Sequence, residues 1–141
     1  MTIIAVGKMT TKGLSDAMNH YKKQLRDLEI IEVKESSMKD EADKIMKLIK
    51  PNDFVITLEI EGKSFSSESL AELLKEKKLY LQGRIVYVIG GSDGLDDSIK
   101  RLSHLKISMS KMTFPHQLSR VMLVEQIYRA QKILEKHPYH K

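Results

Sequence analysis

Runs of valine and isoleucine, separated by helical patterns, constrain the fold of this chain more than any other feature. RIVYVIGG at 84–91 is apolar on both faces, as strands covered by helices on two sides are, and such strands occur in parallel sheets. The sequence therefore predicts an α/β fold with an open, mainly parallel sheet flanked by helices. The expected strands are 2–6, 29–33, 53–60, 84–91 and 105–110.

Helical patterns fill the intervals between these strands. Apolar residues recur at helical spacing from Leu14 to Leu25, and Ser37 with Asp40 forms a candidate cap pair for a second helix that ends at Lys50-Pro51. Further helical segments are expected at 66–79, near 95–102 and at 114–134.

The segment 114–134 is apolar around most of its circumference, whereas a surface helix shows an apolar stripe roughly 100° wide. We expect this helix to be buried on more than one side. It lies either inside the domain or partly against a second subunit.

The length and composition bound the class of protein. A chain of 141 residues suits one domain, 1–141. No apolar run reaches the ~20 residues of a membrane span, and the N-terminus lacks the pattern of a secretory signal. The absence of cysteine excludes disulfides and thiolate chemistry and fits a cytoplasmic protein. His137 and His140 have no further ligands arranged with them, so no metal site is expected.

Charge is distributed unevenly along the chain. Residues 1–99 carry 15 Lys/Arg and 17 Asp/Glu, whereas residues 100–141 carry 9 and 2, with four of the five histidines. A basic C-terminal third on a neutral body is typical of proteins that touch a polyanion, and equally of a solvated basic helix.

The stretch YVIGGSDGLDD, residues 87–97, marks a candidate ligand site. An apolar strand ends on a glycine pair, where a ligand can approach the backbone. Asp93, Asp96 and Asp97 follow at once and would repel phosphates. The dinucleotide, triphosphate and Gly-x-Ser-x-Gly fingerprints are all absent. What remains is a ligand that tolerates carboxylates and needs no metal, and an adenosyl group with a sulfonium cation has these properties.

Five segments together resemble the ribosomal RNA large subunit methyltransferase H family, small knotted enzymes of the SPOUT class. The match runs from end to end and in family order. The segments are AVGK (5–8), VITLEIEGK (55–63), VIGGSDGL (88–95), SMSKMTFPHQLSRVMLVEQIYRA (108–130) and HPYHK (137–141).

The resemblance implies a homodimeric enzyme that uses S-adenosylmethionine to methylate N3 of a pseudouridine in 23S ribosomal RNA on the large subunit or the whole ribosome. It also implies a C-terminal trefoil knot, which periodicity does not reveal. Three segments, 58–62, 90–94 and 109–114, should meet at the carboxyl edge of the sheet. The implied cofactor contacts are Leu58, Gly90, Met109, Ser110, Lys111, Met112, Thr113 and Phe114, with Gly90 leaving room for the ligand.

The candidate catalytic residues lie mostly in the tail. His140 is a candidate base, Tyr139 would position the target base, and Arg129 would stabilise the anion that forms on it. His116 is a second candidate base. Because no RNA-binding module is visible, RNA recognition would come from a basic surface. Two alternatives remain open: a SPOUT enzyme acting on another RNA site, and a non-catalytic RNA- or ribosome-binding module.

Overall fold

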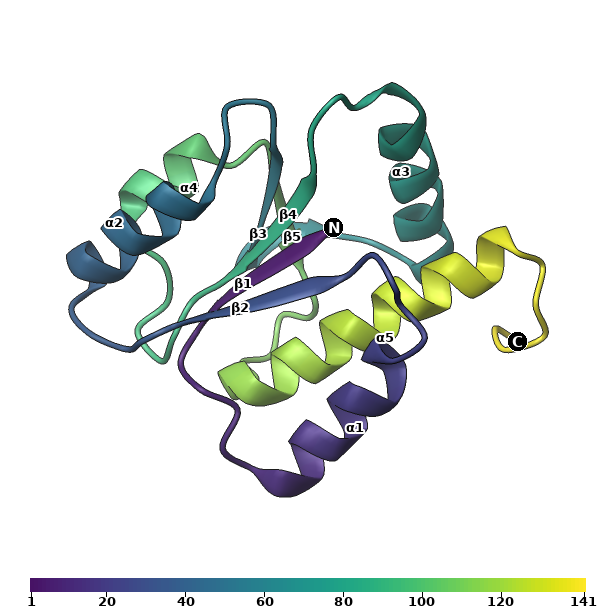
Figure 1. The fold of residues 1–141 in the computed structure, drawn as a ribbon, viewed down its shortest axis with the longest axis horizontal. Helices are drawn as coiled ribbons and strands as arrows, with labels where there is room; N and C mark the ends of the chain where they lie inside the picture. Colours follow the sequence, from purple (N-terminus) through teal and green to yellow (C-terminus); the bar gives the residue numbers. More distant parts are fainter.

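The computed structural model describes residues 1–141 and alternates five strands with five helices (Figure 1). All five strands, and a helix in each expected interval, confirm the sequence prediction to within a few residues. The strands are β1 (Thr2–Val6), β2 (Glu29–Val33), β3 (Phe54–Ser64), β4 (Ile85–Ile89) and β5 (Leu105–Ser108). The helices are α1 (Lys12–Lys22), α2 (Met38–Leu48), α3 (Ser67–Tyr80), α4 (Asp97–Leu102) and α5 (His116–Leu134).

The strands form one sheet in the order β2-β1-β4-β3-β5, and every pairing is parallel. Strand β4 shows why its sequence is apolar throughout. Ile85, Tyr87 and Ile89 belong to the core cluster on one face, and Val86 and Val88 belong to the cluster on the other. Helices α1, α3 and α5 cover the first face and α2 with α4 the second (Figure 1). The predicted open parallel sheet with both faces covered is confirmed.

The cap predicted for α2 is present, because the Ser37 hydroxyl accepts a hydrogen bond of 3.2 Å from the Asp40 N–H. This contact satisfies one of the free N–H groups at the helix start. The helix ends at Leu48, two residues before the Lys50-Pro51 pair, as expected where the residue before proline avoids helical geometry.

Strand β3 is longer than the predicted 53–60. It pairs with β5 through Leu58, bulges over the next residues, and pairs again through Lys63, so that both residues face Ile107. Gly62 permits this passage, since a Cβ there would lie 2.6 Å from the backbone of Ile107. Because the end of β3 is polar, its sequence gives no sign of this long-range pairing. The trefoil knot stays a prediction.

Helix α5 is buried mainly by its own chain. Seven of its residues are buried and none is fully exposed, because it packs against α1, α3 and the sheet. A place inside the domain is thus observed, and a further contact of this helix with a second subunit stays a prediction. The helix begins at His116, two residues later than predicted, with Pro115 in the capping position. None of the helices combines the length and apolar composition of a membrane span.

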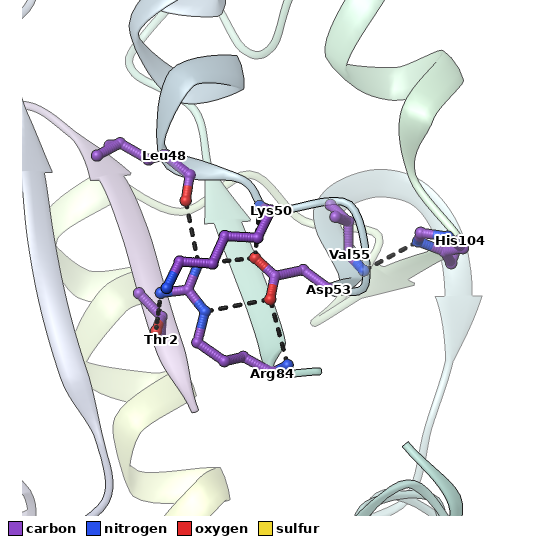
Figure 2. A network of polar contacts seen from close by, with 7 residues as sticks. All are labelled: Thr2, Leu48, Lys50, Asp53, Val55, Arg84 and His104. Carbon is purple, nitrogen blue, oxygen red and sulfur yellow. Dashed lines mark hydrogen bonds and ion pairs between the residues drawn. The ribbon is translucent and has the colours of Figure 1, made fainter. Parts of the chain in front are cut away.

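An ion-pair network joins the amino ends of β1, β3 and β4, at the edge of the sheet opposite their carboxyl ends (Figure 2). Asp53, before β3, accepts hydrogen bonds of 2.7 and 3.1 Å from the guanidinium of Arg84, before β4. Arg84 also donates to the Thr2 hydroxyl (3.3 Å) and to the Leu48 carbonyl (3.0 Å). Burial alone would raise the pKa of Asp53, but the hydrogen bonds from Arg84 and from the Lys50 N–H outweigh it and hold this pKa below its usual value.

Candidate functional site

A cavity of about 810 Å³ lies at the carboxyl ends of β3, β4 and β5. The three segments predicted to meet at this edge, 58–62, 90–94 and 109–114, all contribute to its lining, so their convergence is confirmed. Crevices beyond the carboxyl ends of parallel strands are where open α/β sheets bind ligands, and this volume is within the range of small-molecule sites.

Most of the predicted cofactor residues face this cavity. Lys111 is exposed and does not line it, and Met112 lies at its rim with 71% of its surface exposed. The structure shows that seven of the eight predicted residues line one cavity, while the role of all eight in cofactor binding stays a prediction. The seven that line the cavity are Leu58, Gly90, Met109, Ser110, Met112, Thr113 and Phe114.

The glycine turn after β4 is shaped by its own backbone. A Cβ on Gly90 would lie 2.5 Å from the carbonyl oxygen of Gly94. The backbone of Gly94 therefore occupies the place where a side chain at position 90 would begin. Gly91 and Gly94 pair across the turn, and Gly94 has a φ of +83°, which residues other than glycine rarely adopt. Gly90 therefore allows the turn to close, and the expectation that it also leaves room for the ligand stays a prediction.

The three aspartates of this turn lie outside the cavity lining. Asp96 is the N-cap of α4 and accepts a 2.8 Å hydrogen bond from the Ser98 N–H. Hydrogen bonds from the Ser98 side chain and backbone hold the pKa of Asp96 below its usual value. Asp97 lies 3.9 Å from Lys100 on the surface. Two of the three carboxylates noted in the sequence, Asp96 and Asp97, thus lie at the start of a helix.

Other charged side chains do line the cavity, namely Glu59, Glu61 and Lys100. Glu59 is largely buried, accepts a 2.6 Å hydrogen bond from the Thr57 hydroxyl and lies 4.0 Å from Lys106. Glu59 is balanced by Lys106, and Glu61 and Lys100 add one charge of each sign, so the cavity has no surplus of positive charge that would favour a polyphosphate. The sequence analysis missed these glutamates, although the EIEGK run that contains them was quoted for its resemblance.

His116 also lines the cavity, at the first turn of α5. Its ring packs against Gly7, where a Cβ would lie 3.1 Å from Nε2, and Gly7 has a φ of +85°. One turn later, the fully buried Arg120 donates to the Gly7 carbonyl (2.8 Å) and forms an ion pair with Glu32 (2.7 Å). Arg120, which sequence reasoning missed, therefore fastens the loop after β1 to the start of α5.

The tail residues cluster at the other end of α5. Tyr139 donates a 2.9 Å hydrogen bond to Glu125 and lies under the guanidinium of Arg129, 4.8 Å from the ring centre. Arg129 forms a 2.6 Å ion pair with Glu125 and contacts His140 Nδ1 at 3.3 Å. The structure thus brings the three catalytic candidates together, but none of them lines the cavity that holds the predicted cofactor residues.

The protonation of this cluster follows from its partners. Arginine can only donate, so His140 accepts at Nδ1 and its Nε2–H donates to Glu68 at 2.8 Å. Burial, with the hydrogen bonds to Tyr21 and Glu125, raises the pKa of Tyr139, which is a neutral phenol at physiological pH. The pKa of Glu68 is lowered to about 2 by its own backbone N–H and by His140.

Comparison with known proteins adds to this geometry. The family described as "Predicted SPOUT methyltransferase" matches residues 1–140. The "Ribosomal RNA large subunit methyltransferase H" of Acholeplasma laidlawii is 45% identical, covering 99% of this chain and 97% of the relative. The protein of the same name from Parasynechococcus marenigrum is 43% identical, covering 99% and 94%. A match of this extent establishes the relationship: the chain belongs to the SPOUT methyltransferase family.

Proposed function

We propose that this protein transfers the methyl group of S-adenosylmethionine to N3 of a pseudouridine in large-subunit ribosomal RNA. The observation that carries the proposal is the cavity at the carboxyl edge of the sheet, lined by seven of the eight residues implied as cofactor contacts. The names of the relatives, which are ribosomal RNA methyltransferases, support the substrate class. The surplus of positive charge in residues 100–141 supports a polyanionic partner.

The cavity lining fits the proposed cofactor. Leu58, Met109 and Phe114 offer apolar contacts for an adenine ring, and the backbone of the Gly90–Gly94 turn offers hydrogen-bonding groups. Glu59 and Glu61 suit the positive charges of a sulfonium and an ammonium group. S-Adenosylmethionine, when bound, supplies the electrophilic methyl group.

The chemistry at the target base asks the protein to position an imide nitrogen and to favour the loss of its proton. His116 is the catalytic candidate that already lines the cavity. His140 is hydrogen-bonded to Glu68, and Arg129 is hydrogen-bonded to Glu125. In this arrangement both side chains are therefore already occupied by partners within the protein. We propose that His116 accepts the proton, directly or through one water, and that Tyr139, His140 and Arg129 position the base.

A homodimer is part of the proposal, with residues 1–141 acting as one SPOUT domain in each subunit. Its support comes from α5, where Leu118 and Ile133 stay partly exposed, because exposed apolar surface often marks an interface. Sedimentation at micromolar concentration should give twice the 16.2 kDa of one chain. A monomeric mass would contradict the dimer and leave the enzymatic proposal untouched.

The decisive experiment is mass spectrometry of ribosomal RNA from cells that lack the protein, with purified protein and S-adenosylmethionine added back to their ribosomes. We expect one methyl-pseudouridine to be missing and then restored. A missing methyl group on another nucleotide would favour the alternative RNA site. Normal RNA, with no heat from S-adenosylmethionine in calorimetry, would favour a binding module without catalysis.

A further inference from the structure

A second cavity, of about 770 Å³, lies between α1, α3 and α5 on the sheet face that α5 covers. Its lining is mainly apolar, with Phe65 and Met122 among the side chains that contribute, and Tyr139 closes one side of it. The volume is of the size that binds small organic ligands. Nothing in the proposed cofactor site uses this space.

The two cavities share one residue. Met109, which follows β5, lines both of them, so a ligand in the second cavity would lie beside one in the first. Ser108 lines the second cavity alone, and Met112 lines the first alone. Methyl transfer requires two ligands whose reacting atoms are in contact, so the Met109 side chain would have to move aside for ligands in these neighbouring cavities to react.

The polar groups of the second cavity suit a base with carbonyl and imide groups. Gln126 and Ser67 face each other through a 2.7 Å hydrogen bond, and the Gln126 amide also donates to Glu125 at 2.7 Å. Amide and hydroxyl groups beside aromatic rings are what proteins use to read an extruded base. The guanidinium of Arg129 lies at the same side of the cavity as Tyr139.

Tyr87 adds an independent observation. It belongs to the lining, its side chain is fully buried, and its hydroxyl has no hydrogen-bond partner. Burial raises the pKa of Tyr87, so the group is a neutral phenol that can donate. A buried donor without an acceptor is costly, by about 1–3 kcal/mol. The hydroxyl is closed off from the cavity in this structure, so a ligand carbonyl oxygen would reach it and supply the missing acceptor once the lining adjusts.

We propose that the second cavity receives the target base, a uracil-type base extruded from the RNA, and holds it against Met109 beside the cofactor. This inference rests on the proposed function and adds the place where the substrate binds. Gln126 and Tyr87 are then specificity-determining residues, because they match the carbonyl and imide groups of the base. A second copy of the chain is the competing occupant.

Methionine methyl groups allow a test by NMR, because the chain has reporters in each place. Met112 lines the cofactor cavity, Met122 lines the second cavity, Met109 lines both, and Met46 lies outside them on α2. With the cofactor cavity filled by S-adenosylhomocysteine, pseudouridine 5′-monophosphate is added up to on the order of 10 mM. We expect the nucleotide to shift Met122 and Met109 in a saturable way, and to leave Met112 and Met46 in place.

Two variants, each with a matched control, sharpen the test. Gln126→Leu and Tyr87→Phe should weaken nucleotide binding about five- to tenfold, the usual effect of one lost hydrogen bond. Gln131→Leu on the same helix and Tyr80→Phe on the surface should bind normally. Tyr87→Phe should not lower the melting temperature, since its hydroxyl has no partner to lose. A purely structural role for Tyr87 would leave nucleotide binding unchanged.

The outcomes separate this inference from the proposed function. If S-adenosylhomocysteine shifts Met112 and the nucleotide leaves Met122 in place, the second cavity is not the base site, although the cofactor site stands. A Met122 signal that changes with protein concentration and not with nucleotide would assign the cavity to a second copy and overturn the proposal. If S-adenosylhomocysteine fails to shift Met112, the proposed function itself fails.

Discussion

Gly90 tests the cofactor site at the scale of a single residue. Because a Cβ there would lie 2.5 Å from the Gly94 carbonyl, Gly90→Val must open the turn. We expect the variant to lose at least about tenfold in S-adenosylmethionine affinity by calorimetry, since a displacement of the lining disturbs the contacts made there. Its core should remain folded by circular dichroism, because the turn lies at the edge of the sheet.

Gly13→Ala is the matched control for Gly90→Val. Gly13 lies in α1, has ordinary backbone geometry, and would place its Cβ in open space. Alanine there should raise the free energy of unfolding by about 0.5–1 kcal/mol and leave cofactor affinity unchanged. If Gly90→Val binds the cofactor as tightly as Gly13→Ala does, the cofactor site is misplaced.

Asp53 should contribute to stability in a pH-dependent way. Its pKa is lower in the folded protein than the usual value of about 4, so its contribution is present above that value and is lost as the pH falls below it. We expect Asp53→Asn to cost about 2 kcal/mol at neutral pH, because the side chain is 1% exposed but Arg84 is partly solvated. The variant's melting temperature should fall less than the wild type's below pH 4.

Asp97→Asn provides the comparison for Asp53→Asn. Its carboxylate is 81% exposed and lies 3.9 Å from Lys100, so its removal should change stability by less than about 0.5 kcal/mol. Neither variant should alter S-adenosylmethionine affinity, since neither residue lines the cavity. Equal melting curves for the two variants would show that the Asp53–Arg84 network stabilises the fold no more than the exposed Asp97–Lys100 pair does.

At this scale the sequence predicted some roles and missed others for physical reasons. Ser37 as a cap and Leu58 at the cavity follow from local pattern and from the resemblance. The cap role of Asp96 was obscured by its place in an acidic run beside two glycines. Arg120 and Gln126 lie in a helix that reads as apolar, and only long-range packing shows where their polar groups go.

The C-terminal tail packs against the end of α5 in this structure. We expect HPYHK to fold over the cofactor pocket, of its own or of the partner subunit, when RNA is bound, and this stays a prediction. Tyr139 lies 4.9 Å from the ring of Tyr128 and hydrogen-bonds to Glu125, and His140 contacts Glu68. The composition of the tail indicated order, but not the surface on which it would pack.

Deleting residues 138–141 should reduce methyl transfer by about 100-fold and leave S-adenosylmethionine affinity unchanged. The lost contacts of Tyr139 should also cost about 1–2 kcal/mol of stability, by the usual worth of a partly buried aromatic side chain and one hydrogen bond. Single-turnover methylation of ribosomes and thermal melting measure the two effects. Removing Lys141 alone is the control. Methylation at the normal rate without residues 138–141 would leave the chemistry to His116.

At the scale of the whole molecule, α5 completes the core. It supplies six of the nineteen buried residues in the larger cluster, which also draws on α1, α3 and four strands. A chain that ends at residue 113 should therefore fail to fold cooperatively, whereas one that ends at His137 should fold. Circular dichroism and hydrogen exchange distinguish the two. A cooperative melting transition for the shorter chain would contradict a central role for α5.

The arrangement of the elements was predictable because the alternation of buried strands and helices leaves few topologies. The strand order was not, since parallel neighbours such as β3 and β5 are separated by an intervening strand and two helices. The second cavity was also invisible, because its lining comes from α1, α3, α5 and two strands that only the folded chain brings together. The segments that meet at the carboxyl edge were anticipated because strand direction fixes that edge.

The central position of α5 also bears on how the protein is made. Helix α5 is synthesised after all five strands, yet the sheet face it covers is formed by those strands. Until α5 has emerged from the ribosome, that apolar face lacks its cover, and a nascent chain in this state is open to misassembly. A chaperone at the tunnel exit would therefore meet the face that α5 later occupies.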